Sequence, residues 1–402
     1  MSVQTTSNLT NSIRTQYIAD YLDGSYGMRV YDQLAVPFPG ISAAEVMKGS
    51  SVTYPFLSGM TPGTDTISQD HDVTPQMLRD ATSTFTPTSR YGALQWTEAV
   101  DMQAYTDYGQ KRFKKLGENQ MESVELLALS AVAGGSWVER YVARASLDAG
   151  TAAHRASDAI FRKMQGMMLT LKVPGFIDAN GEANTWSAIM HPFPFHDIAE
   201  SGNVNDIGLY QDRGIHLNFE VAAIGPFRLV VTPYAKVFGG AGLDNGTSVA
   251  TTLAAAANAL STTIVTSADV SANAAVGMFW TIGTEETSST IYPTNERVKI
   301  VSASGTTITV IGEGENGGLR FDHAAGEAVR NADSVYTIVF GGPGSLVKAF
   351  DPSIGEYGEV VGPKKSGILD QFASIGWKYY GGYGRITENR IVRGEFSTSY
   401  EA

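Results

Sequence analysis

Arg228-Leu-Val-Val-Thr-Pro-Tyr-Ala-Lys-Val-Phe-Gly-Gly240 decides how the chain is organised, because its last four residues return at Val339-Phe-Gly-Gly342. In both copies the glycine pair ends an apolar run, and paired glycines at a strand end permit a sharp change of chain direction. The simplest interpretation is one domain that the chain leaves at the first pair and rejoins near the second. A chance recurrence of strands ending in Gly-Gly is the alternative. The predicted insertion hinges are Gly239, Gly240, Gly341 and Gly342.

The segment between the two copies differs in character from the rest of the chain. Residues 243–334 contain at least four short β-branched runs separated by turn residues, such as Thr306-Thr-Ile-Thr-Val-Ile311. Short strands at close spacing are typical of a small barrel or sandwich. We therefore expect an all-β insertion domain at 243–334.

A long helix is the clearest element before this segment. Apolar and small side chains recur at steps of three and four from Tyr105 to Ala131, and Gly134 and Gly135 follow. This pattern predicts a helix of about thirty residues, well above the usual length. The basic run Lys111–Lys115 lies on it, and a solvated or subunit-contacting face explains such a run without a ligand.

Helices and strands follow one another in the remaining sequence, which favours an α+β fold. A second helix is expected from about Ala152 to Leu171, followed by a buried strand at Trp186–His191 and strands at 215–221 and 227–231. Near the C-terminus we expect strands at 375–380 and 385–393. The glycine-rich stretch Gly381–Gly384 between them predicts a hairpin turn.

Composition excludes several classes of protein. A net charge of −12 argues against a protein that grips nucleic-acid phosphates, which needs clustered Lys and Arg. The absence of cysteine excludes disulfides, thiol catalysis and thiolate metal sites. No segment approaches the roughly 20 apolar residues of a membrane span. The polar N-terminus lacks the features of a signal peptide, so we expect synthesis in the cytoplasm.

Motifs that formally match catalytic or binding sites are better explained by structure. Gly312-Glu-Gly-Glu-Asn-Gly317 fits the dinucleotide fingerprint, but its two glutamates would repel phosphate. Asp178–Asn184 alternates oxygen ligands but lacks the glycine and terminal Glu of a calcium loop. His191 and His196 are separated by two prolines, so we expect no shared helical face and no zinc site. No catalytic residue, cofactor or metal is predicted, and the chain is not expected to be an enzyme.

The expected parts are those of a building block of an assembly: an extended arm, a long loop, a very long helix, an α+β body and a β insertion. Five short motifs, in their order along the chain, resemble those of one family. The motifs are Leu57-Ser-Gly-Met-Thr-Pro62, Tyr91-Gly92 before the long helix, Met190-His-Pro192, Ile224-Gly-Pro-Phe-Arg-Leu-Val-Val-Thr-Pro233 and Gly376-Trp-Lys378. One departure is Asp351-Pro352, which lies further before Gly376-Trp-Lys378 than the family's pattern has it. The chain resembles the major capsid proteins of tailed bacteriophages with the Hong Kong 97-type fold.

This resemblance implies a division of the chain. The N-terminal arm is 1–48 and the extended loop 49–97. The peripheral domain with the spine helix takes 98–149 and 371–402, and the axial domain takes 150–242 and 335–370. The all-β insertion domain, 243–334, is expected on the outer surface of the shell, where it does not displace genome.

The implied function is self-assembly, as hexamers and pentamers, into the icosahedral head shell of the virion. The shell encloses double-stranded DNA without sequence-specific binding, involves no membrane, and forms from protein made in the host bacterial cytoplasm. A cement or decoration protein, a scaffold and a portal are the further partners that the resemblance admits. The alternative is a secreted β-rich surface-layer or adhesin subunit. An enzyme with a scattered carboxylate site is a third alternative without support in the sequence.

Overall fold

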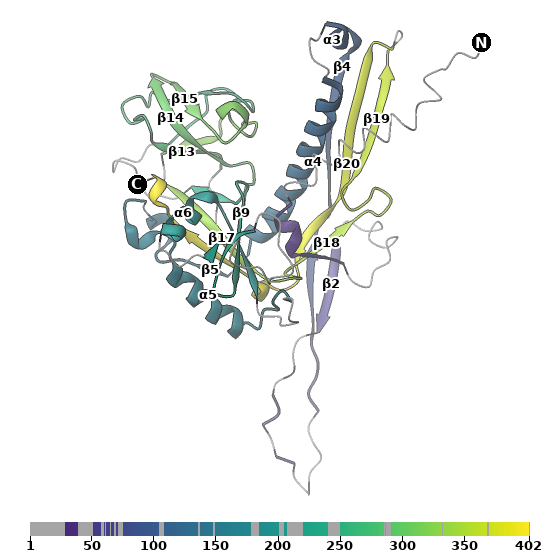
Figure 1. Ribbon diagram of the computed structural model, residues 1–402, viewed down its shortest axis with the longest axis vertical. Coiled ribbons are helices and arrows are strands. Elements are labelled where there is room, and N and C mark those ends of the chain that lie inside the picture. The colour runs from purple at the N-terminus through teal and green to yellow at the C-terminus, as the bar shows by residue number, and fades with distance from the viewer. Residues whose placement is uncertain are drawn as a thin grey trace, which may run out of the picture. The chain divides into compact units, whose positions relative to one another are not determined.

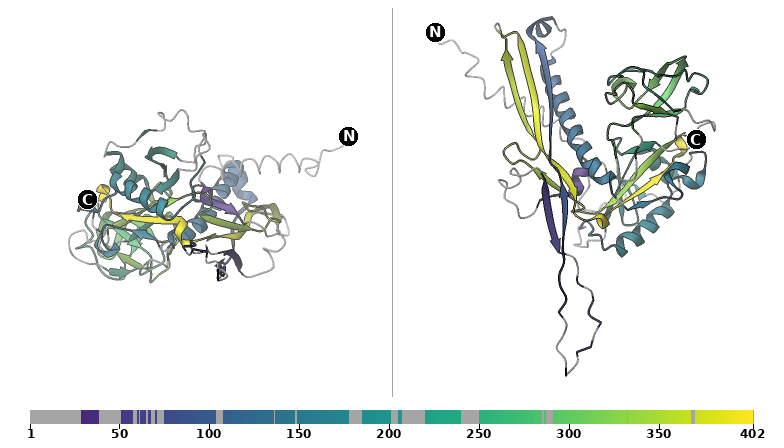
Figure 2. Two further views of the ribbon diagram at one scale, coloured as in Figure 1. Left: turned by 90° about the horizontal axis from the view of Figure 1, so that it is seen from below. Right: turned by 180° about the vertical axis from the view of Figure 1, so that it is seen from behind.

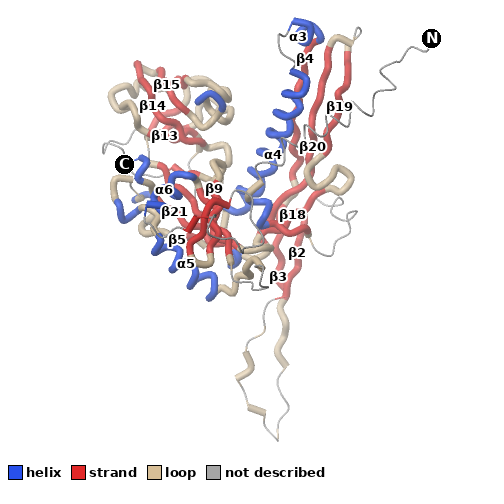
Figure 3. The backbone as a smooth tube through the Cα atoms, viewed as in Figure 1, coloured by secondary structure: helices blue, strands red, loops and turns tan. Residues whose placement is uncertain are grey.

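The computed structural model describes two compact units, each with its own sheets and core (Figure 1). The first unit comprises the described parts of 36–121 and 346–387, and the second those of 26–35, 122–345 and 388–402. Strands predominate over helices in both, and the fold is mixed α+β (Figure 3). The described residues are 29–38, 51–57, 75–103, 108–135, 137–147, 149–177, 185–200, 205–206, 220–239, 250–284, 286, 291–331, 333–367 and 370–401, with single positions between 60 and 70.

The first unit is built around one long strand, β20 (Phe372–Arg385). β4 (Thr88–Thr97) pairs along one edge of β20. On the other edge β19 (Glu359–Ser366) pairs with the first half of β20 and β18 (Leu346–Phe350) with the second half. β1 (Ala35–Pro37) extends this sheet beside β18. The hairpin of β2 (Val52–Leu57) and β3 (Asp80–Phe85) forms a separate two-stranded sheet.

The glycines expected to form a hairpin turn lie instead within β20, so that prediction was wrong. The strand runs unbroken through Gly381–Gly384, and the next strand, β21 (Ile391–Phe396), belongs to a sheet of the second unit. The glycines serve close packing, since a Cβ on Gly384 would lie 2.3 Å from the ring of Phe85. Glycine inside a strand often marks such an approach of another chain segment.

The predicted long helix is confirmed as α4 (Tyr108–Ala133), which ends at Gly134 and follows the short α3 (Glu98–Gln103). In the first unit its contact with the sheet centres on Trp377. The buried indole N–H of Trp377 donates to Oδ1 of Asn119 on α4 at 3.1 Å. Gly92 pairs with Trp377 across β4 and β20. A Cβ on Gly92 would lie 2.6 Å from both bonded atoms, so this position has room only for hydrogen.

The second unit contains an eight-stranded sheet with order β5-β21-β17-β6-β9-β8-β7, and β10 pairs at the end of β17. Helix α5 (Asp158–Thr170) packs its apolar stripe on one face, where Phe161 makes edge-to-face contacts with Phe227 and Phe340. The predicted buried strand is β6 (Trp186–Met190), and all five of its residues are buried. The other strands are β5 (Val138–Glu139), β7 (Asn205–Asp206), β8 (Glu220–Ile224), β9 (Phe227–Val231), β10 (Val237–Gly239) and β17 (Ser334–Gly341).

The segment with two prolines is helical, contrary to expectation. Helix α6 (Pro192–Glu200) begins at Pro192 and includes Pro194 and His196. Both prolines lie in the first turn, where the backbone N–H groups have no partner within the helix and proline is tolerated. His191 precedes the helix, and its Nδ1 accepts the N–H of Phe193 at 3.3 Å.

The remaining strands of the second unit form a separate six-stranded sheet with the order β11-β16-β13-β14-β15-β12. Its two ends meet, because Ser267 N–H donates to Thr252 O and Ala254 N–H to Val265 O, each at 2.8 Å. The sheet therefore closes into a small barrel, called the barrel below, whose ribbon is green in Figure 2. Its core includes Trp280. Its strands are β11 (Ala250–Thr252), β12 (Thr263–Val265), β13 (Phe279–Ile282), β14 (Glu296–Ser304), β15 (Thr307–Ile311) and β16 (Ala328–Arg330).

We expect Gly92→Ala to destabilise the protein by about 1–3 kcal/mol, because the added methyl group overlaps the bond between Trp377 and Asn119. Chemical denaturation followed by tryptophan fluorescence measures this change.

Gly166→Ala is the matched control for this substitution. Gly166 lies inside α5, and a Cβ there meets nothing within 4 Å. Alanine should therefore stabilise the helix by roughly 0.5–1 kcal/mol. Equal effects of the two substitutions would contradict the assigned role of Gly92.

Candidate functional site: the barrel junction and exposed apolar surfaces

The chain enters and leaves the barrel at a single place on the eight-stranded sheet. β10 pairs antiparallel with β17, and Gly239 at the end of β10 lies opposite Ser334 at the start of β17. Of the four glycines predicted as hinges, Gly239 therefore lies at the exit, and Gly240 lies outside the described residues. A Cβ on Gly239 would lie 3.2 Å from Thr281 of the barrel, which favours glycine at this crossing.

Gly341 and Gly342 lie at the other end of β17 from the returning segment. Gly342 begins the turn to β18, where Ser345 Oγ donates to its carbonyl at 2.7 Å. A Cβ on Gly342 would lie 1.9 Å from the carbonyl oxygen of Pro174. This glycine permits close backbone packing. The first copy of the repeat therefore lies where the chain leaves for the barrel, and the second lies in a packed turn before β18.

Arg297 of β14 is the central contact between the barrel and the eight-stranded sheet with its helices, called the body below. Its guanidinium is 7% exposed and binds the carboxylates of Glu313, at 2.9 Å, and of Glu401. It also lies 5.0 Å from the ring centre of Phe193 and 5.2 Å from that of Tyr336. Such cation–π contacts are strongest where water is excluded.

Three groups donate hydrogen bonds to the carboxylate of Glu401. Besides Arg297, it accepts the hydroxyl of Tyr336 and, at 2.9 Å, the backbone N–H of Ser334. The Glu401 side chain is 1% exposed, and burial raises its pKa although Arg297 opposes this shift. Near the C-terminus, this residue thus joins β17 of the body to β14 of the barrel.

Two further ion pairs fasten the barrel to the body. Lys236, at 3% exposure, lies 2.9 Å from Glu286 and also donates to the carbonyl of Tyr292. Arg320 lies 2.6 Å from Glu122 of α4 and stacks over the ring of Tyr234. Because the barrel supplies one partner in each pair, it is not a loosely tethered module.

A cavity of about 320 Å³ opens at this junction between α6, the turn before β10 and the barrel. Its walls include Phe193 and Tyr234, while Arg297 and Arg320 reach it from the barrel. Burial and the adjacent Arg297 lower the pKa of His191 to about 3, so this histidine is neutral at physiological pH. The two arginines are already paired with carboxylates, and the cavity holds no arrangement of a nucleophile with a base.

A buried histidine lies between two carboxylates within the barrel. His323 Nε2 is 2.8 Å from Glu296, and Nδ1 is 2.7 Å from Glu327. Burial alone would lower the pKa of His323, but the hydrogen bonds to both glutamates outweigh it and raise the pKa. Glu296 also accepts the backbone N–H of Arg320, so this triad positions an arginine that contacts the body.

Large apolar side chains are exposed in the first unit. Ile67 is 86% exposed and Met77 is 92% exposed, both between β2 and β3. Tyr91 on β4 is 82% exposed. Isolated exposed apolar residues are ordinary, but a concentration of them indicates a surface that another molecule covers. The others described in this unit are Val36, Leu57, Met60, Leu78, Leu94, Val100, Met102 and Phe372.

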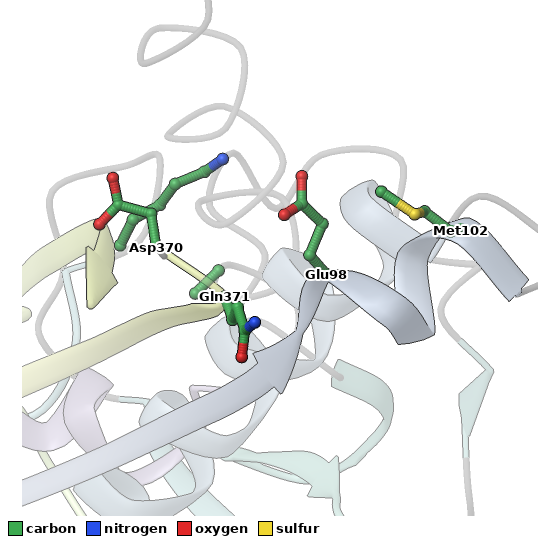
Figure 4. A pocket seen from close by; sticks show the side chains of 6 residues that line it. Glu98, Met102, Asp370 and Gln371 are labelled. Carbon is green, nitrogen blue, oxygen red and sulfur yellow. The ribbon is translucent and has the colours of Figure 1, made fainter. Parts of the chain in front are cut away.

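A second cavity, of about 260 Å³, lies where α3 begins beside β20 (Figure 4). Glu98 and Asp370 project to the same side, and Met102 lies further along α3. Its polar groups are two carboxylates, one lysine and one amide, drawn from exposed positions. This composition offers no buried base, and two exposed carboxylates without a third ligand do not form a metal site.

Of the two glycine- and acid-rich motifs rejected as binding sites from the sequence, the one that the structure describes has a structural role. Gly312–Gly317 runs from β15 into a single 3-10 turn, and its Glu313 pairs with Arg297. Asp178–Asn184 lies outside the described residues. Within the described part of the chain no His, Asp and Glu side chains cluster as metal ligands, and none of its helices could cross a membrane.

Comparison with solved structures identifies the fold. The capsid of Ralstonia phage GP4 matches with a TM-score of 0.51 and 10% identity, over 87% of this chain and 84% of that one. The two chains share a fold. The cyanophage Pam1 capsid has a TM-score of 0.49 with 12% identity, over 92% and 90% of the chains. The cyanophage P-SCSP1u capsid has 0.48 with 10% identity, over 93% and 90%.

The sequence alone identifies no relative. No family model matches it, and no curated protein is similar to it. The similarity to the Ralstonia phage capsid is one of backbone fold and not of sequence, since only 10% of residues are identical. It extends over most of both chains.

Arg297→Met should destabilise the protein by about 3–5 kcal/mol, because it leaves Glu401 buried without its cationic partner. Lys299→Met, two residues along the same strand at an exposed position, should change stability by less than about 0.5 kcal/mol. Urea denaturation of the unassembled chain measures both. Similar losses for the two variants would count against the junction.

His323→Gln should remove a pH-dependent part of the stability. A histidine with a raised folded pKa stabilises fully below its unfolded pKa of about 6.5, and this stabilisation is lost as pH rises through the folded value. The advantage of the unmodified chain over His323→Gln should therefore be full below about pH 6.5 and shrink as the pH rises above it. Melting temperatures of both chains, measured from below about pH 6.5 upwards, test this, and a constant difference would exclude the linkage.

Proposed function

We propose that this chain is a major capsid protein, which self-assembles into the head shell of a tailed bacteriophage. The observation that carries the proposal is the fold shared with the Ralstonia phage GP4 capsid over 87% of the chain. Sequence motifs in the same order as those of the Hong Kong 97-type family point to the same role independently. As a shell component, the protein belongs to the virion and not to the enzymes.

The exposed apolar side chains of the first unit support assembly with further copies. Ile67, Met77 and Tyr91 would each leave apolar area in contact with water in an isolated chain. Burying such area contributes about 25 cal/mol per Å². In a closed ring of identical subunits, each copy offers one surface and receives another, so an extended hairpin can cover a neighbour.

The proposed division of the chain follows the Hong Kong 97-type arrangement. The arm at 1–48 and the extended loop at 49–97, which contains β2 and β3, would lie on neighbouring subunits. The peripheral domain is 98–149 with 371–402, and the axial domain is 150–242 with 335–370. The barrel lies within the proposed insertion domain, 243–334, which we place on the outer surface.

The proposed partners are further copies of the chain, arranged as hexamers and pentamers around double-stranded DNA. The net charge of −12 suits this role, because a strongly basic lining would bind packaged DNA and hinder its release. A cement or decoration protein, a scaffold and a portal complete the set. Synthesis in the host cytoplasm precedes assembly.

Purified protein tests the proposal directly. We expect light scattering to detect large particles or capsomers, and electron microscopy to show closed shells or rings of five and six subunits. A strictly monomeric chain at all accessible concentrations would sink the proposal.

Ile67→Asp should reduce assembly without changing the stability of the unassembled chain, because a charge would replace an apolar side chain that is solvated until copies meet. Thr66→Asp adds the same charge at the adjacent exposed position and is the matched control. The yield of sedimenting particles measures the effect. An equal loss in both variants would point to charge alone.

Replacing residues 243–334 by a short Gly-Ser linker should leave assembly possible but lower stability. The path can close, because Phe238 and Val335 on either side of the replaced segment are paired neighbours. The loss follows from uncovering Phe193 and Tyr336, which the barrel covers with Arg297. Particle yield and melting temperature measure the two effects, and an unaltered melting temperature would contradict the second.

A further inference from the structure

One side of the barrel carries almost no charge. Between Ala250 and Thr284 the only charged residue is Asp269, and between Ile300 and Gly312 there is none. Three charged groups of the barrel, those of Arg297, Arg320 and Glu313, lie instead at the junction with the body. Charged residues make up about 25% of typical soluble domains, so this composition needs a reason.

The strand register arranges the uncharged side chains in two rows. Thr263 lies opposite Thr309, which lies opposite Ser302, across β12, β15 and β14. Val265, Thr307 and Ser304 form the second row in the same way. Thr309 is half-buried and the other five are exposed. We call these six residues the hydroxyl face.

The middle strand of the hydroxyl face, β15, lies away from the body. β13 and β14 approach the body, whereas β15 lies on the distant side of the barrel (Figure 1). The tube drawing gives the same order, with β15 further than β13 from the strands of the eight-stranded sheet (Figure 3). Within this unit the face is therefore open to another molecule.

We propose that the hydroxyl face is a contact between barrels of two copies of this chain, related by a local twofold axis. A twofold contact brings each patch onto the same patch of its partner. A patch of one charge sign would then repel itself, which matters in a chain with a net charge of −12. Hydroxyl groups both donate and accept hydrogen bonds, so Thr and Ser rows are complementary to themselves.

The side chains of the face also lose little entropy on contact. Val and Thr are already restricted about their first side-chain torsion, and short side chains have few rotamers to lose. Ile311, exposed on the same strand as Thr307 and Thr309, adds apolar area at the edge of the face, where Lys299 lies opposite it. The contact rests on the proposed function, because a shell holds the barrels of many copies at fixed separations.

Single cysteines test the contact, because the chain has none of its own. Thr263→Cys and Thr307→Cys place a thiol in each row of the face. We expect a short bismaleimide to link these variants into covalent dimers within assembled particles, as seen on a denaturing gel. Thr294→Cys, exposed in the β13–β14 turn outside the face, is the matched control and should stay monomeric on the gel.

A charge swap checks that the face itself makes the contact. Adding Thr307→Lys to the Thr263→Cys chain should abolish the dimer, because the twofold axis brings two lysines together. Mixing this chain with one that carries Thr263→Cys and Thr307→Glu before assembly should restore it.

The outcomes separate this contact from the proposed function. Particles that form without dimers in the face variants, or with equal dimers in the control, overturn the contact and leave the capsid role standing. Dimers through the face without any shell support the contact and overturn the capsid role. A chain that stays monomeric and forms no cross-link overturns both.

Discussion

The contact between Arg297 and Glu401 is the interaction on which the second unit depends. It lies where the barrel, the central strand β17 and the C-terminal turn meet, and both side chains are almost fully buried. Two charges removed from water are stable together only when each is fully satisfied. Here Glu401 also accepts hydrogen bonds from Tyr336 and Ser334. Arg297 also pairs with Glu313 and lies over aromatic rings. The barrel and the body are thereby joined by a buried and fully paired set of charges.

The same junction explains how the chain can form the barrel without interrupting the eight-stranded sheet. β17 is central to the eight-stranded sheet, and the chain leaves and returns at its first residue through the pairing of Gly239 with Ser334. The segment between these two residues therefore forms the barrel without removing a strand from the eight-stranded sheet. Ion pairs at Lys236 and Arg320 then fix the barrel's orientation. In the proposed shell such rigidity would help, because the surfaces of each subunit must meet those of its neighbours at set angles.

Sequence reasoning predicted elements with strong periodic patterns. The spine-like helix α4, the buried strand β6 and short strands at 250–330 all followed from apolar spacing and turn residues. It failed where tertiary packing decides. Gly381–Gly384 resemble a turn, but they admit the ring of Phe85 against a continuous strand. Pro192 and Pro194 resemble helix breakers, but they occupy the first turn of α6. The pairing of Arg297 with Glu401 leaves no local pattern, since it joins residues distant in the chain.

A double-mutant cycle on Arg297 and Glu401 tests most directly whether the barrel and body are energetically one unit. Arg297→Met and Glu401→Gln are made singly and together, and unfolding free energies are measured by urea denaturation of the unassembled chain. The structure predicts a coupling energy of about 2–3 kcal/mol, because the second substitution removes the unpaired charge that the first creates. Additive losses, agreeing within about 0.5 kcal/mol, would contradict the account.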